Sequence, residues 1–282
     1  MTLISIILLA MTAMVFSQEA TLSERPRFTV TLPHGVMLEM VNIPAGTFTM
    51  GSPLNEPNRD DDEQPHEVTL TQEFWLGVYE VTQEQYLAVI GKNPSWFPEG
   101  GNFPVENITW NEAKEFCEAL NNNPEITRPE GFRFDLPTEA QWEYACRAGT
   151  NTPFFWGNSL NADQANCDGK YPYGTSTQGV YLKRTTRVGH YHNPNPWGLY
   201  DMHGNVWEWT RDHAFWQNAA IKTGNYDKPQ TDPYCTHGDE RIYRGGAWTN
   251  YCRACRSAYR RCRTPDNRYF NIGIRVALVK EE

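Results

Sequence analysis

The stretch RGGAWTNYCRACRSAYRRCRTPDNRYFNIGIRVAL, residues 244–278, combines a regular frame with an irregular filling. The frame consists of Arg-Gly-Gly at 244–246, Trp248, RSAYR at 256–260, Pro-Asp at 265–266, Arg268 and IGIRV at 272–276. The residues between these positions follow neither a helical nor a strand period. We therefore predict an irregular segment whose backbone is held by the frame.

The filling has an unusual composition, because no Lys, Glu, Gln, Met or Trp occurs between Thr249 and Arg275. Substitution at the adenines of an AAC codon gives the residue types that are present and cannot give the five that are absent. Aromatic, arginine and small polar side chains are also those that binding surfaces favour. The filling positions are Thr249, Asn250, Tyr251, Cys252, Arg261, Cys262, Arg263, Thr264, Asn267, Tyr269, Phe270 and Asn271. A purely structural, arginine-rich segment is the alternative.

Length and charge limit the possible classes of protein. A chain of 282 residues with ten Trp and frequent Gly and Pro indicates one large, loop-rich domain. The net charge of −9 argues against a nucleic-acid-binding protein. The seven arginines between 253 and 275 are therefore a local basic patch. We expect Arg256, Arg260 and Arg275 to pair with carbonyls and carboxylates inside the fold.

The N-terminal residues predict export. Residues 3–16 are mostly apolar but too few to span a bilayer, and Ser17 fits a cleavage site. We assign residues 1–17 to a signal peptide, 18–36 to an N-terminal arm of low order and 37–279 to the domain. No other transmembrane run is present, so the expected location is the periplasm, the cell surface or the medium. In such a location disulfides can form, and Cys117 and Cys146 are expected to be core thiols or one bridge.

Local patterns predict few regular elements. Residues 37–43 and 68–82 read as strands, the latter as two. Capping-box patterns begin helices after Thr82 and Thr138, and a further helix is expected over 111–121. The acidic run 55–66 is expected to be a solvated loop. Residues 154–200 have almost no period and are expected to be turns held by ligands, metals or buried polar groups.

Several strings resemble the formylglycine-generating enzyme, or sulfatase-modifying factor, family. They are IPAGTFTMG at 43–51, YEVT at 79–82, LPTEAQWEYA at 136–145, GLYDMHGNVWEW at 198–209 and the 244–276 frame. The resemblance covers nearly all of residues 37–278. It implies an α+β fold, a variant of the C-type lectin fold with low regular secondary structure in a single compact domain.

The resemblance also implies structural calcium. Carried over by position, Asp201 and Glu208 would give side-chain oxygens, and Gly204 and Val206 would give backbone carbonyls. A second site would use Asn166 and the carbonyl of Cys167. Hard oxygen ligands of this kind suit Ca²⁺.

Oxidases of the family bind copper(I) through two cysteines spaced five apart, and this chain departs from that pattern. Ala247 stands five residues before Cys252, where the first cysteine would be required. Cys252 and Cys255 are the candidates that remain for an oxidase, which is one alternative function. A non-catalytic cell-envelope assembly protein is another.

The leading expectation comes from a resemblance to the variable proteins of diversity-generating retroelements. Their varied positions lie in the C-terminal segment of the same fold and bind ligands. By this resemblance residues 245–275 form a variable ligand-binding region in an exported, non-catalytic protein. Tyr251, Tyr269 and Phe270 would be aromatic anchors, and Arg261 and Arg263 would be charged donors. The partner would be a macromolecular or cell-surface ligand.

Overall fold

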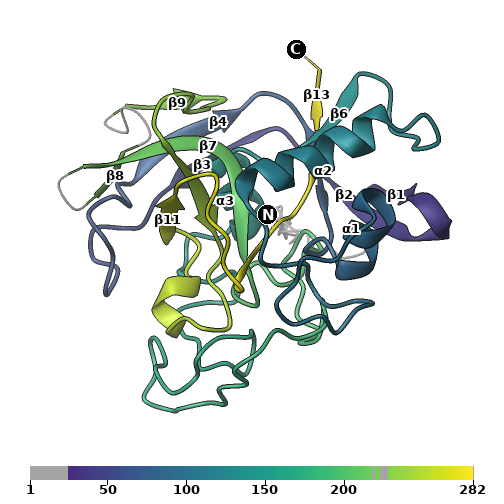
Figure 1. Ribbon diagram of the computed structural model, residues 1–282. Coiled ribbons are helices and arrows are strands. Elements are labelled where there is room, and N and C mark those ends of the chain that lie inside the picture. Colours follow the sequence, from purple (N-terminus) through teal and green to yellow (C-terminus); the bar gives the residue numbers. More distant parts are fainter. Residues whose placement is uncertain (1–24, 218–219, 223–227, 282) are drawn as a thin grey trace, which may run out of the picture.

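The computed structural model describes residues 25–217, 220–222 and 228–281. The predicted signal peptide and residues 18–24 of the predicted arm lie outside the described residues. The described chain forms three sheets and three α-helices (Figure 1). Within these ranges no helix is both long and apolar enough to cross a bilayer.

The first sheet is antiparallel and joins distant parts of the chain. Its order is β1-β2-β5-β13-β6. The strands are β1 (Arg27–Thr31), β2 (Met37–Ile43), β5 (Phe74–Gly77), β13 (Ala277–Lys280) and β6 (Phe132–Asp135). Strand β13 therefore lies between β5 and β6, which come much earlier in the sequence.

Strand β1 corrects the prediction of a poorly ordered arm over 18–36. Residues 27–31 pair in register with β2, from Arg27 opposite Val41 to Thr31 opposite Met37. The physical reason is a short β-favouring run whose Val30 is completely buried. A 3-10 turn, η1 (Pro33–Gly35), connects the two strands.

The second and third sheets place the C-terminal frame. The second sheet has the order β11-β10-β7-β12, with β8 paired to β7. Its strands are β11 (Arg260–Arg263), β10 (Glu240–Arg244), β7 (Trp207–Gln217), β12 (Ile272–Gly273) and β8 (Ala220–Lys222). The third consists of β3 (Gly46–Met50), β4 (His66–Leu70) and β9 (Gln230–Thr231). Strands β4 and β5 confirm the two strands predicted over 68–82.

Each of the three helices begins at a threonine capping box. Helix α1 (Gln83–Ile90) follows Thr82, α2 (Trp110–Asn122) follows Thr109, and α3 (Glu139–Arg147) follows Thr138. In each, the threonine hydroxyl accepts from the third backbone N–H while that residue's side chain accepts from the threonine N–H. The helix starts predicted after Thr82 and Thr138 are confirmed, and α2 extends one residue beyond each predicted end.

Residues 148–206 contain no helix or strand, which confirms the turns predicted for 154–200. They form the loop-rich lower part of Figure 1, beside the 3-10 turn η2 (Cys252–Cys255). Buried asparagines bind this region to helix α3 and to the connection between β5 and α1. Asn195 donates to the carbonyl of Ala145 at 2.7 Å, and Asn205 donates to Glu80 at 2.6 Å. Such side chains replace the backbone pairing that a sheet would supply.

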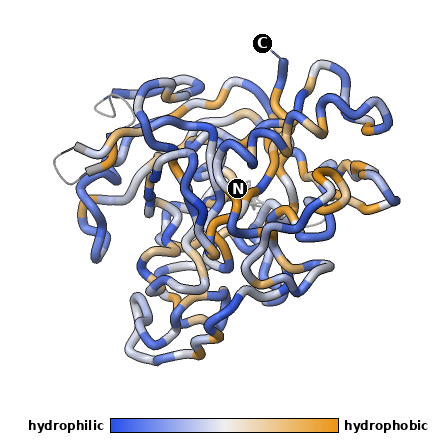
Figure 2. The backbone as a smooth tube through the Cα atoms, in the orientation of Figure 1, coloured by the Kyte–Doolittle hydropathy of each residue, from blue (hydrophilic) through white to orange (hydrophobic). Residues whose placement is uncertain are grey.

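The buried apolar side chains of the described residues form four clusters. Trp142 of α3 and Trp209 of β7 are fully buried. Figure 2 shows apolar stretches along the inner strands and hydrophilic residues on the outlying loops. Cys117 and Cys146 are buried, separate thiols, so the expected alternative of a bridge between them does not hold.

Candidate functional site

We call residues 249–271 the C-terminal segment. It contains η2 and β11 and ends in a loop before β12. Its backbone is hydrogen-bonded to the 160–180 loop at one end and to strand β7 at the other. Asp168 N–H donates to the carbonyl of Asn250 at 2.8 Å, and Trp207 N–H donates to the carbonyl of Asn271 at 2.9 Å. Backbone hydrogen bonds therefore fix both ends of this irregular segment.

Most filling side chains reach solvent. Tyr251 is 49% exposed and Phe270 is 41% exposed, and Arg263 and Thr264 are also exposed. The remaining partly exposed positions are Thr249, Asn250, Arg261, Asn267, Tyr269 and Asn271. The aromatic and arginine side chains predicted as ligand contacts are thus at least partly accessible.

Cys252 and Cys262 are corrections to the predicted ligand-binding set. Their exposures are 0% and 3%, so neither offers a ligand a usable atom. Cys252 belongs to a cluster with other thiols, and Cys262 packs with Ala214, Ile221 and Ile242. Both behave as small apolar core residues.

Buried arginines of the frame bind the backbone of the segment. Arg244 is fully buried and donates to the carbonyls of Ser257, Ala258 and Tyr259 at 2.8–2.9 Å. It also pairs with Glu143 of α3. One guanidinium therefore satisfies three successive carbonyls of a turn that has no sheet or helix to pair them.

Arg256 binds the acidic run 55–66. Its Nη1 lies 2.6 Å from Glu56 and 2.7 Å from Glu63, and its Nη2 lies 2.7 Å from the other oxygen of Glu63. Glu56 and Glu63 are 8% and 2% exposed. The prediction of a solvated acidic loop is therefore wrong at these positions, because a buried guanidinium compensates their desolvation. Paired Arg256 confirms the expectation of structural arginines.

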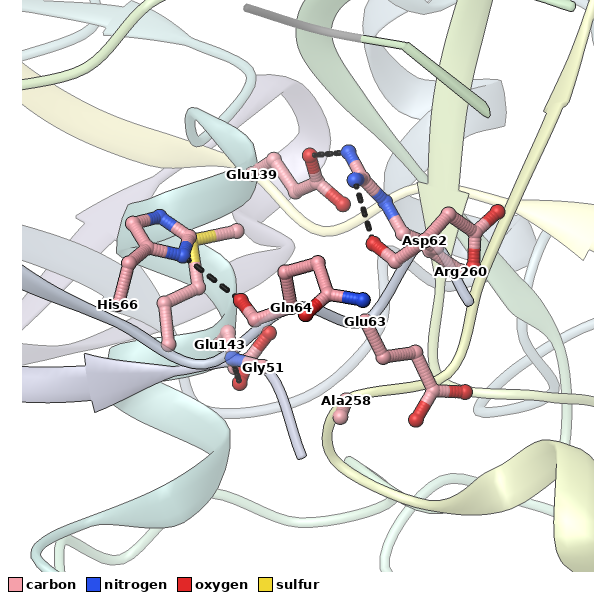
Figure 3. A pocket seen from close by; sticks show the side chains of 10 residues that line it. Gly51, Asp62, Glu63, Gln64, His66, Glu139, Glu143, Ala258 and Arg260 are labelled. Atoms are coloured by element: carbon pink, nitrogen blue, oxygen red, sulfur yellow. Dashed lines mark hydrogen bonds and ion pairs between the residues drawn. The ribbon is translucent and has the colours of Figure 1, made fainter. Parts of the chain in front are cut away.

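A small cavity, about 10 Å³, lies where this loop, α3 and the segment meet (Figure 3). Arg260 pairs there with Glu139 and donates to the carbonyl of Asp62 at 3.3 Å. His66 Nδ1 lies 2.9 Å from the carbonyl of Gln64. A space of this size holds about one water molecule. The contacts of Arg260 beside the cavity support the segment, and the cavity itself is too small for a ligand.

Aromatic residues outside the segment contact its exposed aromatic side chains. Tyr171 stacks on Tyr251 with ring centroids 3.9 Å apart. Trp248 lies 5.7 Å from Phe270 and 5.5 Å from Phe97. Sequence reasoning missed Tyr171 and Phe97, because their loops approach the segment only through the tertiary fold.

Arg261 also lines a depression beside β11. It has a volume of about 370 Å³, and its lining includes Asp60, Trp216, Arg253 and Arg261. The Asp60 carboxylate lies 3.6 Å from Arg261 and 3.9 Å from Arg253. Because these groups remain partly exposed, the pairs contribute little to folding and their charges stay available to a ligand.

The first predicted calcium set does not fit. Both oxygens of Glu208 are taken by Arg275, at 2.7–3.0 Å, and one also accepts from Trp142 at 2.6 Å. This corrects Glu208 as a calcium ligand and leaves Asp201 as the set's one remaining side-chain ligand. Asp201 accepts from Gly189 N–H at 2.6 Å, and burial raises the pKa of its carboxyl to about 6.

In the second predicted calcium set, one residue is suited to bind the ion. Asn166 is buried and its Oδ1 has no hydrogen-bond partner, while its Nδ2 donates to the carbonyl of Arg184 at 3.0 Å. An unpartnered buried oxygen is the type of group that Ca²⁺ would satisfy. Cys167 is its neighbour in the chain. Within the described ranges, no three His, Cys, Asp or Glu side chains converge as a metal cluster.

The cysteine pair considered for copper does not fit an oxidase site. Cys252 and Cys255 are both fully buried, so neither a peptide nor dioxygen has direct access. The sulfur of Cys252 lies against Cys167, and buried Ala247 occupies the position of the missing cysteine. We derive no oxidative step from this arrangement.

The fold and its C-terminal frame define a class. Residues 29–280 match the family described as sulfatase-modifying factor enzyme 1-like domain, and the chain belongs to that family. It has the formylglycine-generating-enzyme-type variant of the C-type lectin fold, as the resemblance predicted.

The chain is similar to individual relatives over most of its length. Treponema denticola variable protein 1 is 27% identical, with a TM-score of 0.69, over 89% of this chain and 98% of that one. PvdO from Pseudomonas aeruginosa is 29% identical, also with a TM-score of 0.69, over 85% and 94%. The formylglycine-generating enzyme of Mus musculus is 29% identical over 86% of this chain and 75% of its own length.

Proposed function

We propose that this protein is an exported, non-catalytic ligand-binding protein that presents the exposed side chains of the C-terminal segment to a macromolecular or cell-surface partner. The observation that carries the proposal is the division between frame and filling. Arg244, Arg256 and Arg275 are fully buried, whereas ten of the twelve filling side chains are exposed or partly exposed. Side chains at those positions can change without changing the core.

The composition of the filling supports variation at these positions. The exposed residues belong to the types that adenine substitution in AAC codons produces. Similarity to a Treponema denticola protein described as variable supports the same interpretation. The apolar run at residues 3–16 supports export.

Sequencing the DNA around the gene tests the proposal directly. We expect a second, near-identical copy of the region that encodes residues 249–271, with AAC codons at the filling positions, and a reverse-transcriptase gene close by. A flanking region with neither feature would remove the variable-display proposal. It would leave the family and fold unchanged.

A copper assay tests the enzymatic alternative, which the similarity to the mouse enzyme raises. Purified full-length protein would be loaded with copper(I) and incubated with a peptide containing Cys-x-Pro-x-Arg. We expect the cysteine of the peptide to keep its mass, because Cys252 and Cys255 are buried. Conversion of that cysteine to formylglycine would overturn the non-catalytic assignment.

A further inference from the structure

Two cysteines from distant parts of the chain meet beneath the C-terminal segment. The sulfur atoms of Cys167 and Cys252 lie 2.9 Å apart, and the residues are 1% and 0% exposed. Cys167 also has a side-chain contact with Cys255, which is fully buried. Phe154 and Tyr173 pack around this group of three thiols.

The backbone on both sides brings these sulfurs together. Asp168 pairs with Tyr251 as a parallel bridge. Asp168 N–H donates to the carbonyl of Asn250 at 2.8 Å, and Cys252 N–H donates to the carbonyl of Tyr171 at 3.2 Å. The residues next to each cysteine are therefore hydrogen-bonded across the same contact, so the sulfurs are positioned by the fold.

The other cysteines have different surroundings. Cys146 lies 3.7 Å from a ring nitrogen of His203 and 3.7 Å from the Ser257 hydroxyl. Cys235 donates to the carbonyl of His237 at 3.4 Å. Cys262 lies in an aliphatic cluster. These thiols offer natural controls for the pair Cys167 and Cys252.

We propose that Cys167 and Cys252 form a disulfide that locks the C-terminal segment to the 160–180 loop. One thiolate attacks a small external disulfide, such as oxidised glutathione, and releases one molecule of its thiol. The second thiolate then attacks the mixed disulfide and releases the other. The two cysteines together lose two protons and two electrons, which appear in two molecules of reduced glutathione.

Burial determines when the bond forms. Because both sulfurs are covered in the folded chain, exchange takes place during folding, before the two cysteines are buried. The two cysteines are 85 positions apart, so the cross-link restricts a long loop of the unfolded chain. It would stabilise a segment that has little regular structure. The cross-link does not require that the segment bind a ligand.

Refolding under two redox conditions tests this proposal. Full-length protein, with Cys252→Ser and Cys262→Ser variants as matched substitutions, would be unfolded in guanidinium. Each would be refolded either in a buffer of reduced and oxidised glutathione or in excess reductant. Free thiols would be alkylated after unfolding, and the peptides would be mapped by mass spectrometry without reduction. Thermal unfolding would be measured on the same samples.

We expect a linked peptide pair that contains Cys167 and Cys252, lighter by two hydrogens, in the wild type and in Cys262→Ser. We also expect Tm to rise by about 10 °C on oxidation in those two proteins and not in Cys252→Ser. If Cys167 and Cys252 are both alkylated in the oxidised wild type, or if Cys167 is linked to Cys255, the assignment is overturned. If Cys252→Ser fails to fold, the peptide map of the wild type still decides.

Discussion

Arg256 and Glu63 form a two-pronged ion pair, with both nitrogen-to-oxygen distances 2.7 Å, between positions 193 apart in the chain. The pair is buried, and Glu56 adds a second carboxylate to the same guanidinium. This contact fixes the turn from which the exposed side chains of the C-terminal segment project. Arg256 is thus part of the buried frame, whereas most filling side chains reach solvent.

Replacing Arg256 by Gln should be severely destabilising. The change leaves Glu56 and Glu63 buried without a positive charge, and removal of one partner from such a pair costs about 3–5 kcal/mol. Urea unfolding of the purified variant measures the loss. The exposed Arg263→Gln is the matched control and should change stability by less than about 0.5 kcal/mol. Equal effects of the two substitutions would contradict the division between frame and filling.

Replacing the exposed Phe270 by Ser should leave the fold intact. Its ring is 41% exposed, so we expect a loss of about 1 kcal/mol at most. Trp248, which packs against it and is 6% exposed, gives the contrast. We expect Trp248→Ala to cost about 3–5 kcal/mol in the same denaturant experiment. A large loss from Phe270→Ser would mean that the segment carries core residues where we place ligand contacts.

Stability should decrease as the pH rises, in part because of Glu106. Burial raises the pKa of its carboxyl from 4.5 to about 7, and its Oε2 has no hydrogen-bond partner. The folded state thus holds a proton that the unfolded state releases, and the corresponding stability is lost between about pH 4.5 and pH 7. The contribution is about 3 kcal/mol.

Glu106→Gln isolates this effect. We expect the variant to lose less stability than the wild type between pH 5 and pH 8 in urea titrations. The exposed Glu130→Gln should follow the wild-type curve. Identical pH profiles for Glu106→Gln and the wild type would show that this carboxyl does not carry the predicted proton.

Calcium should raise the thermal stability if Asn166 supplies a ligand. Its unpartnered Oδ1 gives Ca²⁺ an oxygen that the protein alone leaves unsatisfied. At about 100 times Kd the gain would be about 2.7 kcal/mol, measurable as a Tm shift with Ca²⁺ against a chelator. Asn166→Ala should abolish the shift, whereas Glu208→Gln should destabilise without abolishing it. The same shift in Asn166→Ala would place any calcium elsewhere.

Local chemistry could be predicted from the sequence. The hydroxyls of Thr82 and Thr138 cap their helices as expected, because a capping box involves only four neighbouring residues. The family strings predicted the fold, and the frame predicted that its residues hold the backbone of an irregular segment. Arg256 and Arg275 are structural arginines, as predicted.

Long-range partners could not be predicted in the same way. The run of carboxylates that includes Glu56 and Glu63 has the composition of a solvated loop, and only the buried Arg256 makes it part of the interior. Glu208 is the type of residue that binds calcium, yet its carboxylate accepts hydrogen bonds from Arg275. Tyr171 joins the exposed aromatic face through a loop with no sequence period. Each of these results depends on which groups meet in space.

Strand β13 lies between β5 and β6 and follows the C-terminal segment in the chain. During synthesis, the first sheet therefore stays open until residues 277–280 have emerged from the ribosome. A frameshift that ended translation within 249–271 would remove the strand that closes the sheet. Such truncated products would be left unfolded and open to proteolysis, while full-length products with altered surface residues would fold.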